Sequence, residues 1–76
     1  MPNIRTETRL AHQALSDREY EVLCWIGKGN TVSEIAAELN LSVSTVSTYR
    51  IRILEKLNLR TNADLTYYAI KQGLVE

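Results

Sequence analysis

Residues 44–56 bring together side chains that could contact a polar, anionic ligand. If this segment is helical, an advance of about 100° per residue places hydroxyl, methyl and guanidinium groups on one side. The residues expected to face outward are Ser44, Ser47, Thr48, Ile51, Arg52 and Glu55, with Thr45 and Lys56 at their flanks. An exposed Ile51 among hydroxyls is unusual on a surface that meets only water. It suits the major groove of DNA, where a branched side chain can contact thymine methyls and hydroxyls can reach base edges.

The sequence offers little for catalysis or for metal binding. Its single cysteine, Cys24, excludes an internal disulfide, and because His12 is the only histidine, no Cys/His zinc set can be assembled. No nucleophile–base pair or phosphate-binding loop is visible. We therefore expect no enzymatic activity, no metal and no cofactor. Cys24 is expected opposite the core side of its helix as an incidental thiol, with a redox switch as the alternative.

Length and composition indicate one small globular domain. The 76 residues are 45% hydrophobic and 24% charged, which is typical of folded rather than disordered chains. No apolar run approaches the roughly 20 residues of a membrane span, and residues 1–10 lack the apolar core of a signal peptide. We expect an intracellular protein without a membrane contact. Residues 1–14 are polar and are expected to form a linker or flexible arm, with residues 15–76 as the domain.

The outward face requires a helical scaffold, and the sequence predicts four helices. Capping residues mark the four starts, and they are Ser16 with Glu19, Thr31 with Glu34, Ser42, and Thr61 with Asp64. Gly29 and Asn40 suit the left-handed conformation that ends a helix. The expected helices span about 17–28, 31–40, 43–57 and 61–72. We predict an all-α fold, a compact four-helix bundle that contains a helix-turn-helix.

The helix-turn-helix prediction depends on the joint between the second and third helices. Only Asn40, Leu41 and Ser42 separate them, and so short a joint makes the helices cross steeply. Residues expected to face inward around this joint are Ile35, Leu39, Leu41, Val46 and Tyr49, while Ala36 lies where the two backbones come closest. Val46, Ile53 and Leu57 should form the inward stripe of the third helix. A plain helical hairpin remains the alternative.

Charge is segregated along the chain although the formal net charge is zero. Residues 45–60 carry four basic residues and one acidic residue, a net charge of +3. Residues 16–40 carry two basic and five acidic residues, a net charge of −3. This layout places phosphate-binding potential on the third helix, and a merely solvated basic face is the alternative.

Arg50 lies near the inward stripe of the third helix, so its guanidinium needs a partner. Glu19 lies on the inward side of the first helix, and one interpretation is a partly buried Glu19–Arg50 ion pair. The other is that Arg50 extends outward to a phosphate group.

Several ordered blocks of the sequence resemble the LuxR-type helix-turn-helix domain. The resemblance covers Leu15 to about Leu74 and is carried by Leu15-Ser16-x-Arg18-Glu19-x-Glu21-Val22-Leu23, Gly29, Glu34-Ile35-Ala36-x-x-Leu39, Leu41-Ser42-x-x-Thr45-Val46-Ser47-x-Tyr49 and Lys56-Leu57. Residues 45–49 and 55–57 are most similar to the NarL/FixJ response-regulator branch, particularly its BvgA- and EvgA-like members. This implies the C-terminal DNA-binding effector domain of a bacterial transcription factor.

The resemblance also implies roles for individual positions. The third helix would enter the major groove, with Ser47, Thr48 and Ile51 facing bases, joined by Ser44 from the helical pattern. The residues implied to hold phosphates are Thr45, Arg52, Lys56, Thr31, Val32 and Ser33. Two positions depart from the commonest family pattern. Ser47 stands where lysine is frequent, and Tyr49 stands where histidine is frequent.

The implied partners are double-stranded DNA with two-fold related half-sites and a second copy of the chain, paired through the fourth helix. Among the residues of that helix that could cover the core or form the interface, we assign Leu65, Tyr67 and Lys71 to the interface and Tyr68 to the core. An N-terminal receiver domain would be absent from this chain, which is either an excised domain or a stand-alone regulator. RNA polymerase is a further candidate partner, and the expected location is the bacterial cytoplasm, at the nucleoid.

Two other functions stay open at the level of sequence. The domain could be the effector of a regulator that binds a small quorum-sensing signal instead of a phospho-receiver. It could also be a helical protein-interaction module that never contacts DNA. The outward face around Thr48 and Arg52 separates the last possibility from DNA binding, because alanine there should abolish binding to DNA only.

Overall fold

The computed structural model describes residues 14–75, and within that range the chain forms four helices and no strand. The helices are α2 (Asp17–Gly27), α3 (Val32–Leu39), α4 (Val43–Leu57) and α5 (Asn62–Lys71). The all-α prediction is confirmed, and the expected helices are found within a residue or so of their predicted ends. Of the linker predicted over residues 1–14, residues 1–13 lie outside the described part of the chain.

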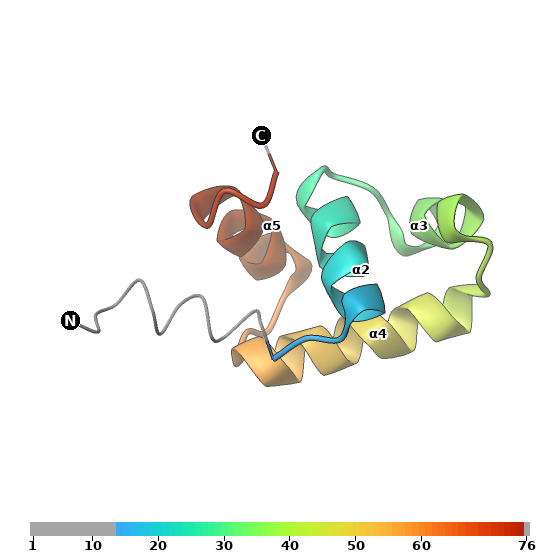
Figure 1. Ribbon diagram of the computed structural model, residues 1–76, viewed down its shortest axis with the longest axis horizontal. Coiled ribbons are helices and arrows are strands. Elements are labelled where there is room, and N and C mark those ends of the chain that lie inside the picture. The colour runs from blue at the N-terminus through green and yellow to red at the C-terminus, as the bar shows by residue number, and fades with distance from the viewer. Residues whose placement is uncertain (1–13, 76) are drawn as a thin grey trace.

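The helices pack around α2, which contacts the other three, while α3 also contacts α4. In Figure 1, α4 is the longest helix and runs beneath α2, with α3 above its N-terminal end and α5 on the other side of α2. The core between them is formed by Leu15, Val22, Leu23, Ile26, Ile35, Ala36, Val46, Ile53, Leu57, Leu65, Ala69 and Val75. No helix among residues 14–75 is long and apolar enough to cross a membrane.

Each helix begins where the sequence predicts, at a side chain that satisfies free backbone N–H groups. Ser16, Thr31 and Thr61 form complete capping boxes with the acidic residue three positions later. Ser42 accepts the backbone N–H of Thr45 at the start of α4. A cap of this kind contributes about 1 kcal/mol, which matters for helices as short as α3.

All four helices end in the same way, at a residue with positive φ. These residues are Gly29, Asn40, Asn58 and Gly73, and the sequence reasoning did not single out Asn58. After each of them the next backbone N–H donates to the carbonyl five residues earlier, as in Leu41 to Ala36 at 2.9 Å. At three of the four helix ends this next residue is a leucine that packs against the core. The chain therefore turns sharply after each helix without leaving its last carbonyls unpaired.

The joint between α3 and α4 has the expected helix-turn-helix form. Figure 1 shows α3 nearly end-on where α4 is seen from the side, so the two helices cross. Ala36 and Val46 are buried at their contact, and Leu41 in the turn is half-buried against the core. Tyr49 packs half-buried against the same cluster. The helix-turn-helix prediction is confirmed, and the plain hairpin is excluded.

Gly27 sits where α2 and α5 come too close for a side chain between them. A Cβ atom at this position would lie 2.6 Å from the Cβ of Ala69 and 3.2 Å from a methyl group of Val75. The hydroxyl of Thr66 donates to the carbonyl of Ile26 in the same contact, at 3.4 Å. Glycine is required here by packing and not by an unusual backbone conformation.

Replacing Gly27 with alanine should destabilise the fold. Overpacking of this kind costs about 1–3 kcal/mol, and it should outweigh the gain of about 1 kcal/mol from the better helix former. Urea unfolding of Gly27→Ala measures the effect. Adding Ala69→Gly removes the opposing Cβ, so the double variant should be more stable than the sum of the two single changes predicts. An unchanged or raised unfolding midpoint for Gly27→Ala would contradict the close contact.

Candidate nucleic-acid interface

The exposed side of α4 is the candidate interface, and it lies opposite the residues through which the helix packs against the core. Val46, Ile53 and Leu57 are buried, as the inward stripe predicts. The exposed residues are Ser44, Thr48, Ile51, Arg52 and Glu55, with Ser47 and Thr45 half-buried beside them. Ile51 is 49% exposed. The structure thus brings the predicted base-facing residues together on one surface of one helix.

A chain of hydroxyl groups lies at the N-terminal end of α4. The Ser42 hydroxyl donates to Oγ1 of Thr45 at 2.8 Å and accepts the Thr45 backbone N–H at 3.1 Å. It also lies 3.3 Å from the Ser44 hydroxyl. Because Ser42 has one hydroxyl hydrogen and gives it to Thr45, Ser44 must be the donor in this contact. Within residues 14–75 the Thr45 hydroxyl accepts this bond and donates none.

Thr48 is held by a different bond one turn further along α4. Its hydroxyl donates to the backbone carbonyl of Ser44 at 3.0 Å. The threonine therefore shows its methyl group and an oxygen lone pair to the outside, rather than a free hydrogen.

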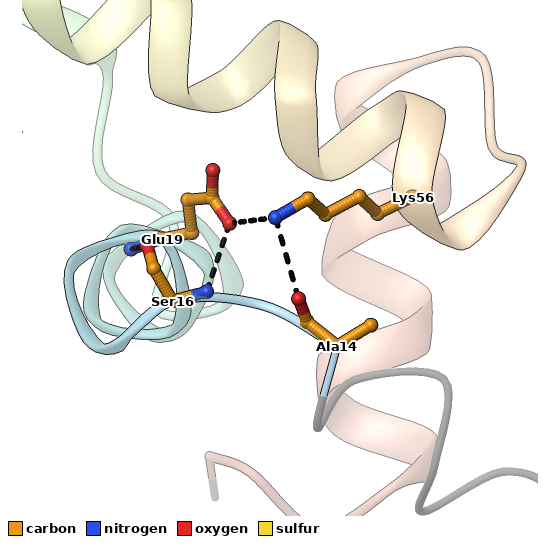
Figure 2. A network of polar contacts seen from close by, with 4 residues as sticks. All are labelled: Ala14, Ser16, Glu19 and Lys56. Carbon is orange, nitrogen blue, oxygen red and sulfur yellow. Dashed lines mark hydrogen bonds and ion pairs between the residues drawn. The ribbon is translucent and has the colours of Figure 1, made fainter.

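The orientation of α4 against α2 is fixed by a buried carboxylate (Figure 2). Glu19 is 3% exposed, and its Oε1 accepts from Nζ of Lys56 at 2.8 Å and from the backbone N–H of Ser16 at 2.9 Å. The same ammonium donates to the Ala14 carbonyl at 3.3 Å. Burial alone would raise the pKa of Glu19, but the Lys56 ammonium and the Ser16 N–H outweigh it, so the pKa lies below its usual value.

The predicted Glu19–Arg50 pair is wrong. Arg50 instead donates from Nη1 to Oδ1 of Asn62 at 3.1 Å and joins α4 to the first residue of α5. The reason is axial distance, since Lys56 lies six residues beyond Arg50, roughly 9 Å further along the helix and level with Glu19. Lys56, expected as a phosphate ligand, is therefore engaged inside the domain, although its side chain remains 40% exposed.

The start of α3 supplies the second group of predicted phosphate contacts. Thr31 and Ser33 are exposed, whereas Val32 is half-buried and packs against the core. The Thr31 hydroxyl accepts the backbone N–H of Glu34. Val32 therefore offers only its backbone to an outside partner, whereas the side chain of Ser33 is exposed.

The outer side of α5 carries an apolar surface that only partly matches the prediction. Tyr67 and Ile70 are 65% and 54% exposed, and the Lys71 ammonium lies 5.6 Å from the centre of the Tyr67 ring. Leu65 is fully buried in the core, so its assignment to an interface with a second copy is wrong. Tyr68 packs half-buried against the core, as expected. Ile70 was missed, although its spacing of three from Tyr67 places both on one helix face.

Cys24 also differs from its prediction. It is half-buried and packs against the core instead of lying opposite it. Burial raises the pKa of its thiol, more than the nearby Tyr20 hydroxyl and Lys28 ammonium lower it. In residues 14–75 no three His, Cys, Asp or Glu side chains form a group that could hold a metal ion.

Comparisons with known proteins agree with this geometry. The family described as "Bacterial regulatory proteins, luxR family" matches residues 13–69. Response regulator UvrY of Escherichia coli K12 is 44% identical over 70 residues, which cover 92% of this chain and 31% of UvrY. Transcriptional regulatory protein LiaR of Bacillus subtilis 168 is 39% identical over 69 residues, 91% of this chain and 33% of LiaR.

Oxygen regulatory protein NreC of Staphylococcus carnosus TM300 is a third relative, 44% identical over 62 residues, 82% of this chain and 29% of NreC. The chain thus spans about a third of the length of the curated relatives it matches.

The Glu19–Lys56 pair should have a measurable effect on stability. Lys56→Met leaves a buried carboxylate without its cation, and we expect a loss of about 1–3 kcal/mol, less than for a fully buried pair because the ammonium is half in solvent. Glu19→Gln/Lys56→Met should recover part of that loss, because no buried charge is left unpaired. A double variant no more stable than Lys56→Met alone would contradict the pairing.

The same pair predicts the acid sensitivity of the domain. Because the pKa of Glu19 is lowered in the folded protein, its stabilising effect is complete above the ordinary glutamate value of about 4.3. That effect is lost as the pH falls through the lower folded-state value. Urea midpoints measured from neutral to acidic pH should fall less steeply for Glu19→Gln than for the unaltered protein.

Proposed function

Because this chain belongs to the luxR family of bacterial regulatory proteins, we propose that it is a sequence-specific DNA-binding domain, the C-terminal effector of a transcriptional regulator. The observation that carries the proposal is the exposed face of α4, the second helix of a helix-turn-helix. This face combines hydroxyls, a half-exposed isoleucine and an arginine. A helix of this kind can enter the major groove, where side chains reach base edges.

In the proposed complex the side chains divide into base readers and phosphate contacts. Ser44, Ser47, Thr48 and Ile51 face bases. The free hydroxyl hydrogen of Thr45 and the guanidinium of Arg52 hold phosphates, together with Thr31, Ser33 and the backbone of Val32 at the start of α3. Lys56 acts chiefly as a positioning residue, because Glu19 already binds its ammonium. The net charge of +3 over residues 45–60 supports attraction to the DNA backbone.

A second copy of the chain is proposed to pair through the outer side of α5. Tyr67, Ile70 and Lys71 supply the exposed surface for it, in place of the buried Leu65. One short helix gives a small interface, and small interfaces are commonly weak. We therefore expect a monomer in dilute solution that pairs on two-fold related half-sites.

The regulation of this domain is proposed from its relatives. UvrY is named a response regulator, and it is about three times as long as the matched segment. In this proposal a phospho-receiver domain controls access to α4 or to the outer side of α5. DNA binding places the protein in the bacterial cytoplasm at the nucleoid, where RNA polymerase is a further partner.

Selection of bound duplexes from a random pool tests the proposal and identifies the operator. Recovery of related half-sites, with affinity that falls as salt rises, supports it. Arg52→Ala should then weaken binding to all sequences and reduce the slope of log affinity against log salt by about one, as expected for one lost phosphate contact. Lys28→Ala removes a cation that instead stacks on Trp25, so the salt slope should stay as it was. A pool without enrichment would refute DNA reading.

Pairing through α5 has a separate test. Tyr67→Ser/Ile70→Ser should leave affinity for a duplex with one half-site unchanged and should reduce cooperative binding to two half-sites. Titrations monitored by fluorescence anisotropy can compare the two duplexes. Sedimentation of the unaltered protein without DNA should show a monomer, and a stable dimer there would overturn the weak-interface prediction.

A further inference from the structure

The base-facing side of α4 has few hydrogen-bond donors left for a ligand. The Thr48 hydroxyl gives its hydrogen to the Ser44 carbonyl at 3.0 Å, and the Ser44 hydroxyl gives its hydrogen to Ser42 at 3.3 Å. Ser47 is half-buried. Two of the three hydroxyls on this side therefore offer oxygen lone pairs and carbon rather than free hydrogens.

The longer polar side chains that read purines are also scarce on α4. Residues 43–57 include no Asn, Gln or His, so the amide pair that recognises adenine is missing. Of the three basic residues, Arg50 is bound to Asn62 and Lys56 to Glu19. Arg52 makes no hydrogen bond or ion pair within residues 14–75, but the proposed complex assigns it to a phosphate, so α4 has no basic side chain left to recognise guanine.

What the surface does present is methyl groups. Ile51 leaves 49% of its area exposed. Thr48 is three residues earlier, so the two side chains are neighbours on the helix surface. The bond from its hydroxyl to the backbone fixes the Thr48 rotamer and with it the position of its methyl group. Together they form a small apolar patch in the middle of the base-facing side.

We propose that α4 recognises its half-site mainly through the 5-methyl groups of thymine, with Ile51 as the residue that determines this specificity and the Thr48 methyl as its support. The inference rests on the proposed function and deepens it. Thymine alone presents a methyl group in the major groove, and an apolar side chain is its matching partner. Half-sites should therefore contain one or two thymines that cannot be replaced by bases without this methyl group.

Deoxyuridine tests the inference because it lacks only the 5-methyl group and keeps the pairing edge of thymine. Each thymine of the selected operator is replaced in turn, and dissociation constants are measured on single half-site duplexes. At one or two positions we expect binding about fourfold weaker, as for loss of one buried methyl worth about 0.8 kcal/mol. For the Ile51→Ala variant, the dissociation constant of the deoxyuridine duplex divided by that of the thymine duplex should fall to about one at those positions.

Val43→Ala is the matched control, because it shortens a β-branched side chain of α4 that is also half-exposed, at 50%, and that has no assigned contact with a base, a phosphate or a second copy; it should keep the thymine-to-deoxyuridine ratio. Ile51 is exposed, so Ile51→Ala should fold, and its unfolding midpoint verifies this. If a specific operator is bound but no deoxyuridine weakens binding, or if Ile51→Ala retains the full ratio, this inference is overturned and DNA binding stands. If no duplex is selected at all, both are overturned.

Discussion

The carboxylate of Glu19 is the point on which the arrangement of the helices depends. It is nearly removed from water, and a buried charge is tolerated only when it is paired and hydrogen-bonded. Its Oε1 accepts hydrogen bonds from the backbone N–H of Ser16, at the start of α2, and from the ammonium of Lys56 on α4. That ammonium also donates to the carbonyl of Ala14. The start of α2, the C-terminal half of α4 and the entering chain are thereby joined at one place.

Such a pair specifies geometry more than it adds stability. Well-packed apolar side chains could hold two helices together as strongly, but they would tolerate sliding. The 2.8 Å ion pair between Glu19 and Lys56 does not tolerate sliding, because a shift of α4 by one residue would separate the two charges. The exposed side of α4 is consequently presented at one angle, which a reader of base edges requires.

Local features of the fold could be predicted from the sequence, and features that depend on the relative height of two helices could not. Ser16, Thr31 and Thr61 cap their helices through residues three positions away, so the pattern alone reveals them. The partner of Glu19 was misassigned because the helical period places Arg50 near the inward stripe and Lys56 only at the flank of the outward face, and periodicity says nothing about axial position. Leu65 and Ile70 illustrate a further limit, since two apolar residues on one helix differ only in what packs against them.

The candidate site, like the fold, could be predicted from the sequence only in part. The side of α4 on which Thr48 and Ile51 lie follows from its helical period and is confirmed by their exposure. Which hydroxyl hydrogens are already used could not be predicted, because Thr48 and Ser44 make bonds that depend on rotamers. The chemistry offered to a ligand is therefore narrower than the residue types suggest.

The two sides of α4 share no residue, and this separation affects how the domain can evolve. The buried side carries the stability of the fold, whereas substitutions at exposed positions usually change stability by about 0.5 kcal/mol or less. New operators can therefore be acquired by drift at Thr48 or Ile51 without an intermediate that fails to fold. Ser42 and Thr45 are the exception, because the Ser42 hydroxyl caps the helix and is bound to the Thr45 hydroxyl, and both residues border the reading surface. Among duplicated descendants of this chain, positions 48 and 51 should diversify first, while positions 42 and 45 remain serine or threonine.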